Sequence, residues 1–148
     1  MSGSKEQERV SAITQAVEAA RERIIALHRS YVQVRSVTGD EGAMGARVAE
    51  TFRERGLATE TRVATAEEMR PYLEHVGEQP GYEGRLNVAG KRNGAGGGRS
   101  ILLNAHIDTV PEGDPSLWTQ PPFAASVVNG RVYGRGSCDM KGGLATHL

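Results

Sequence analysis

The sequence predicts an α/β protein in which helices flank a mixed, largely parallel sheet. Three observations lead to this class. Apolar residues recur every three or four positions near the start, as they do on one face of a helix. The run ILLNA at 101–105 is apolar with little alternation, which is typical of a central strand covered on both faces. Helical and strand-like patterns also follow one another along a chain long enough for one domain.

The first two predicted elements are helices. An amphipathic helix is predicted over residues 5–34, with an apolar stripe expected to pack on the core of the same domain, although a partner helix elsewhere could also cover it. The stripe consists of Val10, Ile13, Val17, Ala20, Ile24 and Leu27. A second helix is predicted within residues 36–56, where Thr38 and Glu41 fit a capping box and Gly56 is a natural stop.

The middle of the chain has the pattern of strands. They are predicted over residues 57–64, 85–94 and 99–108. Residues 65–76 contain a second capping-box pattern, but Pro71 indicates a short or broken helix. The glycine-rich stretch at 93–98 is expected to be a flexible turn. It lacks the glycine patterns of phosphate and dinucleotide loops, so no phosphate-binding role is assigned to it.

Two further elements are predicted near the end of the chain. Asn129 and Gly130 lie between two β-rich runs, which is the pattern of a hairpin with a two-residue type I′ turn. Residues 140–148 have the pattern of the first turns of a helix. The sequence shows no internal repeat.

Composition excludes several classes of protein. The 18 basic and 18 acidic residues cancel, so charge gives no reason to expect nucleic acid or an anionic membrane as a partner. No apolar run approaches the roughly 18 residues of a membrane span, and the polar start lacks the apolar core of a secretory signal. The single cysteine, Cys138, excludes an internal disulfide framework. These observations predict a cytoplasmic protein without nucleic-acid or membrane partners.

His106 and Asp108 form the first candidate site. They end the predicted strand at 99–108, where a repeat of two directs both side chains to the same side. Open α/β sheets place their ligand crevices at this end of their strands. A metal-binding imidazole usually donates its second N–H to a carboxylate, and Asp108 is well placed to accept it. A histidine and an aspartate at an ordinary strand end would look the same, so this pair alone does not establish a metal site.

Asp139 is the second candidate. It follows the glycine-rich GRGS and precedes MKGG, where glycines let the backbone approach a site closely. A carboxylate at such a position can bridge two divalent ions through its two oxygens. It can equally cap the helix that is predicted to follow.

Three motifs occur in order and carry a family resemblance: HIDTVP at 106–111, WTQPPF at 118–123 and GRGSCDMKGG at 134–143. Over about residues 85–148 the chain resembles the M20 family of metallopeptidases and deacylases, with a lean toward the acetylornithine deacetylase and desuccinylase branch. The resemblance implies a zinc-exopeptidase-like catalytic domain. It also implies hydrolysis of the amide bond of an N-acyl amino acid or short peptide by a water that two metal ions activate.

The resemblance implies a role for each candidate residue. His106 is implied to be a ligand of one metal ion, Asp108 the catalytic acid that orients His106, and Asp139 the bridging carboxylate. The ions would be zinc, two in each complete site, with cobalt as a substitute. The bond between Asp139 and Met140 is implied to be cis. Lys141 is implied to support this turn, with a solvated charge as the alternative.

The remaining reactive side chains are not assigned to the site. Cys138 is interpreted as a small buried side chain beside the ligand. Ser137 has no GxSxG setting, so a serine hydrolase is not predicted. The other histidines match no ligand of the family; they are His28, His75 and His147.

The 148 residues are expected to be the N-terminal part of one metallohydrolase catalytic domain. Members of the family continue with a pair of adjacent glutamates, further ligands and an inserted domain often used for dimer contacts. Glu67 and Glu68 precede the metal-site strand, so they are not that pair. A zinc site takes three or four protein ligands, so the chain alone is expected to be inactive. The resemblance implies that the full-length form is a homodimer. The alternative is a non-catalytic product, inert or bound to a full-length partner.

Overall fold

The computed structural model of the chain describes residues 2–77 and 79–148. Its helices are α1 (Ser2–Val32), α2 (Gly42–Glu54), α3 (Ala66–Met69), α4 (Leu73–Val76) and α5 (Gly142–Thr146). Its strands are β1 (Ala58–Val63), β2 (Leu86–Lys91), β3 (Ser126–Val128) and β4 (Arg131–Tyr133). Within the described ranges, no helix combines the length and the apolar character needed to cross a membrane.

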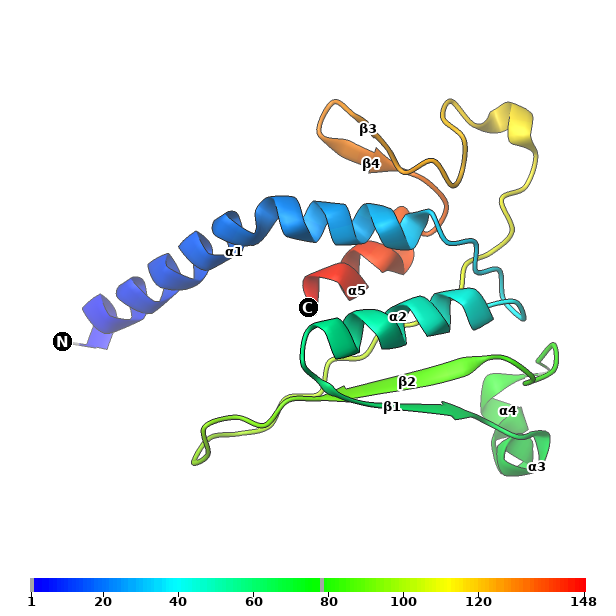
Figure 1. Cartoon of the computed structure of the whole chain (residues 1–148), viewed down its shortest axis with the longest axis horizontal. Helices are drawn as coiled ribbons and strands as arrows, with labels where there is room; N and C mark the ends of the chain where they lie inside the picture. The colour runs from blue at the N-terminus through cyan, green and yellow to red at the C-terminus, as the bar shows by residue number, and fades with distance from the viewer. Residues whose placement is uncertain (1, 78) are drawn as a thin grey trace.

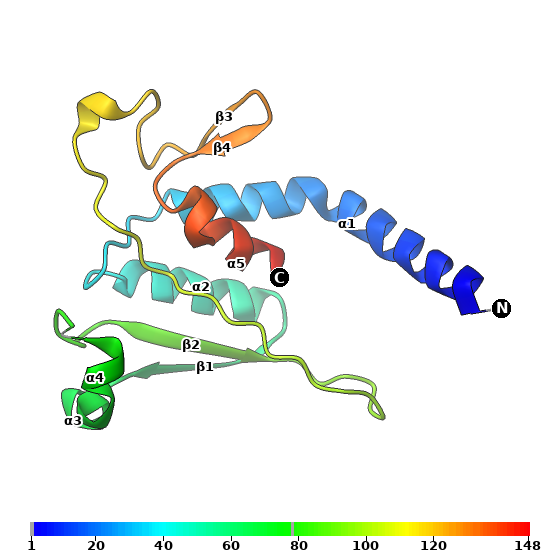
Figure 2. The same cartoon turned by 180° about the vertical axis from the view of Figure 1, so that it is seen from behind.

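Helix α2 lies between two layers (Figure 1). The β1–β2 pair packs on one side of it, and α5 lies on its other side next to α1 (Figures 1 and 2). The β3–β4 hairpin lies beyond α1. The buried core is formed by Leu27, Tyr31, Met44, Val48, Leu144 and Ala145. These residues come from α1, α2 and α5, so the helices rather than the strands hold the core.

Only the C-terminal half of α1 packs on this core. Leu27 is 7% exposed, whereas Val10, Ile13 and Val17 are 56%, 64% and 56% exposed. The N-terminal half projects away from the other elements (Figure 1). The expectation that the whole stripe packs on the domain's own core is therefore wrong, because no other element of the described chain reaches the first turns of this long helix.

The two halves of α1 are expected to respond differently to the same kind of truncation. Leu27→Ala removes a core side chain and should lower the free energy of unfolding by about 2–3 kcal/mol. Ile13→Ala removes an exposed side chain and should change it by less than about 0.5 kcal/mol. Denaturant unfolding followed by circular dichroism measures both. Equal losses in the two variants would contradict this division of the helix.

Helix α2 begins without the predicted capping box. Glu41 is its N-cap residue and makes no side-chain cap. Its carboxylate, 4% exposed as a residue, instead accepts from Gly39 N at 2.8 Å and from Arg85 Nε and Nη2 at 2.8 and 3.1 Å. The buried ion pair outcompetes the cap and ties the start of α2 to the start of β2. The predicted end is confirmed, since Gly56 adopts a φ of +71° just after the helix.

The sheet differs most from the prediction. β1 and β2 pair antiparallel, as do β3 and β4, and the largely parallel sheet is not found in the described ranges. Residues 101–108 are extended but belong to no strand. The one parallel contact of this region is the isolated bridge between Val37 and Thr109. The apolar run fails as a strand because neither of its backbone edges meets a partner among the described residues.

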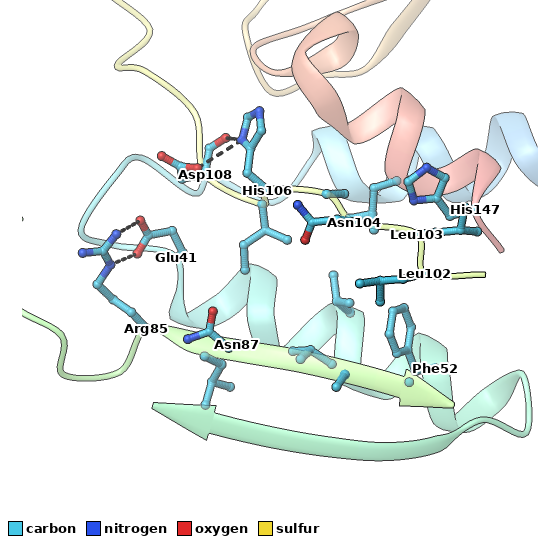
Figure 3. Close-up of a pocket in the computed structure, with 18 of the residues that line it drawn as sticks. Glu41, Phe52, Arg85, Asn87, Leu102, Leu103, Asn104, His106, Asp108 and His147 are labelled. Carbon is cyan, nitrogen blue, oxygen red and sulfur yellow. Dashed lines mark hydrogen bonds and ion pairs between the residues drawn. The ribbon is translucent and has the colours of Figure 1, made fainter. Parts of the chain in front are cut away.

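A groove of about 820 Å³ separates residues 101–108 from β2. Its walls include Leu102, Leu103, Val48 and Phe52, and His106 and Asp108 also line it (Figure 3). Leu102 is 91% exposed. The groove therefore combines apolar walls with two residues of the candidate site.

The local predictions around turns are confirmed. Thr65 and Glu68 form the capping box of α3, and Pro71 divides this region into short pieces. Asn129 and Gly130 adopt positive φ angles of 51° and 74° between β3 and β4, as a type I′ turn requires.

Candidate functional site

His106 and Asp108 lie in the extended segment that lines the groove, and hydrogen bonds to Ser36, in the segment after α1, hold the end of this segment. Thr109 N donates to Ser36 O at 2.8 Å, and Ser36 Oγ donates to Ile107 O at 2.8 Å. His106 Nδ1 lies 3.1 Å from Asp108 Oδ1 and 3.1 Å from its backbone oxygen. Figure 3 shows the imidazole above this carboxylate. The imidazole therefore lies within hydrogen-bonding distance of the Asp108 carboxylate, which is the contact that an orienting role for Asp108 requires.

Asp139 reaches the same place from the turn before α5. Its Oδ1 lies 2.8 Å from His106 Nε2, so residues 33 positions apart face each other. The Asp139–Met140 peptide bond is cis, as the family resemblance implies. Gly136 allows this turn to pack closely, since it has a φ of +76° and a Cβ there would collide with Thr109 Cγ2. The structure brings together all three residues singled out in the sequence.

The imidazole lies between two acids, and its electrostatics follow from that. The hydrogen bond to Asp139 raises the pKa of His106 above its usual value, while partial burial works in the opposite direction. Partial burial acts to raise the pKa of Asp108. Hydrogen bonds from Thr38 and His106 outweigh it, so the pKa of this carboxyl lies below its usual value. Asp108 is thus held as an acceptor for the imidazole N–H.

Lys141 is buried, and the alternative of a solvated charge is wrong. The residue is 0% exposed, and its Nζ donates to Val34 O at 2.6 Å. Burial lowers the pKa of this amine to about 8. Lys141 therefore fastens the Asp139 turn to the end of α1, which agrees with its expected supporting role.

The other reactive side chains lie outside this arrangement. Cys138 is exposed, so its interpretation as a buried side chain is wrong, because Lys141 supplies the buried side chain of this turn. His28 Nε2 lies 2.9 Å from Ser137 O, and burial lowers its pKa. His147, just after α5, lines the groove. Within residues 2–77 and 79–148, no three His, Cys, Asp or Glu side chains form a group that could hold a metal ion.

Sequence reasoning missed the part of Thr38 in this site. It was assigned to a helix cap, but its hydroxyl donates to Asp108 Oδ2 at 2.6 Å. The capping pattern with Glu41 concealed this contact, and no local signal in the sequence connects positions 70 residues apart.

Comparison with known proteins finds a family whose sequence pattern matches the segment that contains the candidate site. The model of peptidase family M20/M25/M40 matches residues 102–148, which contain His106, Asp108 and Asp139. This segment therefore matches the M20 family of peptidases, and the similarity to individual relatives extends over most of this chain.

Its curated relatives include three enzymes named succinyl-diaminopimelate desuccinylase. The one from Methylorubrum populi is 32% identical over 124 residues, or 84% of this chain and 28% of that protein. The one from Methylobacterium sp. is 34% identical over 121 residues, or 82% and 27%. The one from Paracoccus denitrificans is 50% identical over 54 residues, or 36% and 14%. The chain thus spans about a quarter of the length of the first two relatives.

Proposed function

We propose that the chain forms part of the catalytic domain of a metal-dependent amidohydrolase that cleaves the amide bond of an N-acyl amino acid or short peptide. The observation that carries this proposal is the imidazole of His106, held between Asp108 and Asp139 within the segment that matches the family. The desuccinylase names of the relatives favour a succinylated amino acid as substrate. The complete enzyme is proposed to be a cytoplasmic homodimer.

The donors present suit zinc, which binds imidazole nitrogen and carboxylate oxygen. His106 would supply Nε2 to one ion, because Asp108 accepts from Nδ1 and leaves the other nitrogen directed toward Asp139. The Asp139 side chain is 87% exposed, so its second oxygen is open to a second ion. Zinc, when bound, supplies Lewis acidity toward water and toward an amide carbonyl.

Residues of this chain would orient the imidazole and hold the turn that carries Asp139. Asp108 would orient the ring through Nδ1, and Asp139 places a carboxylate opposite Nε2. Lys141 and Gly136 hold the turn on which Asp139 lies. Two ligands are fewer than the three or four of a zinc site, so we propose that residues outside these 148 supply the remaining ligands and the general base.

The chain on its own is therefore expected to be inactive. Purified and supplied with Zn²⁺ or Co²⁺, it should release no succinate from succinyl-diaminopimelate above the rate of a metal-only blank. It should also lose zinc during dialysis, as measured by elemental analysis. Metal-dependent turnover by the chain alone would contradict the proposal that the site is completed elsewhere.

A chimera tests the function itself. Residues 1–148 would replace the matched part of the Methylorubrum populi desuccinylase, which is 32% identical. We expect the chimera to bind zinc and to hydrolyse succinyl-diaminopimelate, with the unaltered relative as reference. A chimera that folds and retains zinc but hydrolyses neither this compound nor other N-acyl amino acids would overturn the proposed function.

A further inference from the structure

We propose that Thr38 is a positioning residue of the site: its hydroxyl holds the Asp108 carboxylate in the orientation that directs His106. This inference rests on the proposed function only in so far as His106 serves as a ligand. The contact between Thr38 and Asp108 does not depend on that function, because residues 36–38 lie beside residues 107–109 in the fold.

The two oxygens of Asp108 have separate partners. Oδ2 accepts from Thr38 Oγ1 at 2.6 Å, and Oδ1 lies 3.1 Å from His106 Nδ1. A carboxylate bound through one oxygen can turn about its Cβ–Cγ bond. A carboxylate bound through both oxygens cannot turn without losing at least one hydrogen bond. Thr38 therefore fixes the plane in which Asp108 meets the imidazole.

The hydroxyl of Thr38 has one proton to donate, and the geometry decides its direction. The alternative acceptor, Thr109 O, lies 3.5 Å away, against 2.6 Å for the carboxylate. A hydrogen bond to an ionised oxygen is shorter and roughly twice as strong as a neutral one. The proton is therefore directed to Asp108.

The backbone keeps Thr38 in reach of Asp108. Thr38 N donates to Thr109 O at 3.1 Å, and Thr109 N donates to Ser36 O at 2.8 Å. These two bonds form the parallel bridge at Val37. The hydroxyl is thus presented by fixed backbone, although Thr38 itself is exposed at the surface.

Isosteric substitution separates the hydroxyl from the shape of the residue. Thr38→Val removes the hydroxyl and keeps the branched side chain, whereas Thr38→Ser keeps the hydroxyl and removes the methyl group. Thr14→Val is the matched control, because the Thr14 hydroxyl donates only to Val10 O on the exposed half of α1. Circular dichroism and amide spectra establish that each variant folds.

The readout is the tautomer of the neutral His106 ring in the metal-free chain. Ring nitrogen shifts are measured at high pH, once they no longer change with pH, in chains that all carry Asp139→Ala, because the Asp139 carboxylate 2.8 Å from Nε2 would otherwise favour a proton on that nitrogen. In this background the chain with Thr38 should carry the ring proton mainly on Nδ1. Thr38→Val should reduce this preference, which the backbone oxygen of Asp108 at 3.1 Å from Nδ1 still supports in part. Thr38→Ser should restore the preference, and Thr14→Val should not change it. An unchanged tautomer in Thr38→Val, or an equal loss in Thr38→Ser, would overturn the proposal.

A second measurement needs no substitution. A crystal structure of the unaltered chain should place Thr38 Oγ1 within hydrogen-bonding distance of one Asp108 carboxylate oxygen and His106 Nδ1 within reach of the other. An Asp108 carboxylate turned away from Thr38 while it still contacts His106 would overturn the proposal, even if Thr38→Val proved unfolded.

The same substitution in the active chimera gives the functional consequence. Loss of a group that orients a ligand typically costs about 10- to 100-fold in metal affinity or activity. Thr38→Val should lower kcat by about tenfold, and Thr38→Ser should recover most of it. A chimera that folds and retains zinc but is inactive, combined with the expected tautomer shift, would refute the proposed function and leave the role of Thr38 standing.

Discussion

Asp139→Ala in the active chimera is expected to lower kcat/KM for succinyl-diaminopimelate by more than about a thousandfold. A metal ion contributes several kcal/mol to the stabilisation of a transition state, and each 1.4 kcal/mol or so is a factor of ten in rate. Asp139 is the proposed bridge between two ions, so its loss removes a ligand from both. His106→Ala removes a ligand from one ion and should cause a loss of similar order.

Matched controls exist for both variants. Asp114 lies in an exposed 3-10 turn, where its carboxylate accepts only from Ser116 N, and His75 has a side chain that is 71% exposed. Asp114→Ala and His75→Ala should leave kcat/KM within about twofold of the chimera. Zinc content measured beside the rates should fall with His106→Ala and Asp139→Ala. Near-normal turnover in either site variant would overturn the assignment of that residue.

The second large effect is expected at Lys141. Lys141→Ala should lower the free energy of unfolding of the chain by about 3–4 kcal/mol. Its four-carbon stem is buried, and truncating a buried side chain of this size costs about 2–5 kcal/mol. The substitution also removes the hydrogen bond to Val34 O, which adds about 1 kcal/mol or more to the destabilisation. Burial of the ammonium group is itself unfavourable, so its removal offsets part of these two costs.

Two further variants separate the contribution of the buried stem from that of the hydrogen bond and provide an exposed control. Lys141→Met keeps most of the buried stem and removes the hydrogen bond, so its loss should be less than half that of Lys141→Ala. Lys91→Ala removes an exposed lysine at the end of β2 and should change stability by less than about 0.5 kcal/mol. Denaturant midpoints measured for the three variants test this order. A Lys141→Ala chain as stable as Lys91→Ala would refute the supporting role of Lys141.

Elements whose signals are local could be predicted from the sequence. The Asn129–Gly130 turn, the capping box at Thr65 and the stop at Gly56 depend on residues within a few positions, and all three are confirmed. Strands β1 and β2 also lie within residues 57–64 and 85–94, where the sequence predicts strands. These patterns act through backbone angles and neighbouring hydrogen bonds, so distant parts of the chain do not alter them.

Elements that need a distant partner could not be predicted in the same way. The apolar stripe of α1 and the run at 101–105 have the right residues, but burial depends on what lies opposite. Nothing in the described chain covers Ile13 or pairs with Leu102, so both remain exposed. Amphipathic pattern indicates which face is to be buried, and it says nothing of the surface that buries it.

The candidate site was predictable in its residues and less so in its supports. Two of the three motifs contain His106, Asp108 and Asp139, which is why the sequence selects them as candidates, and the structure places His106 within hydrogen-bonding distance of both acids. Thr38 was hidden behind a capping pattern, and the sequence left open whether Lys141 supports the turn or is a solvated charge. Both act across long sequence separations, where a single sequence carries no pairing information.

The exposed apolar run at 101–103 has a consequence for how the chain behaves in solution. Extended backbone with free edges and apolar side chains is a template for pairing between molecules. Salts such as sulfate strengthen apolar association by exclusion from protein surfaces. The purified chain should therefore precipitate at lower sulfate concentrations than a variant in which Leu102 is replaced by a charged residue, and chloride buffers of low concentration should suit its handling best.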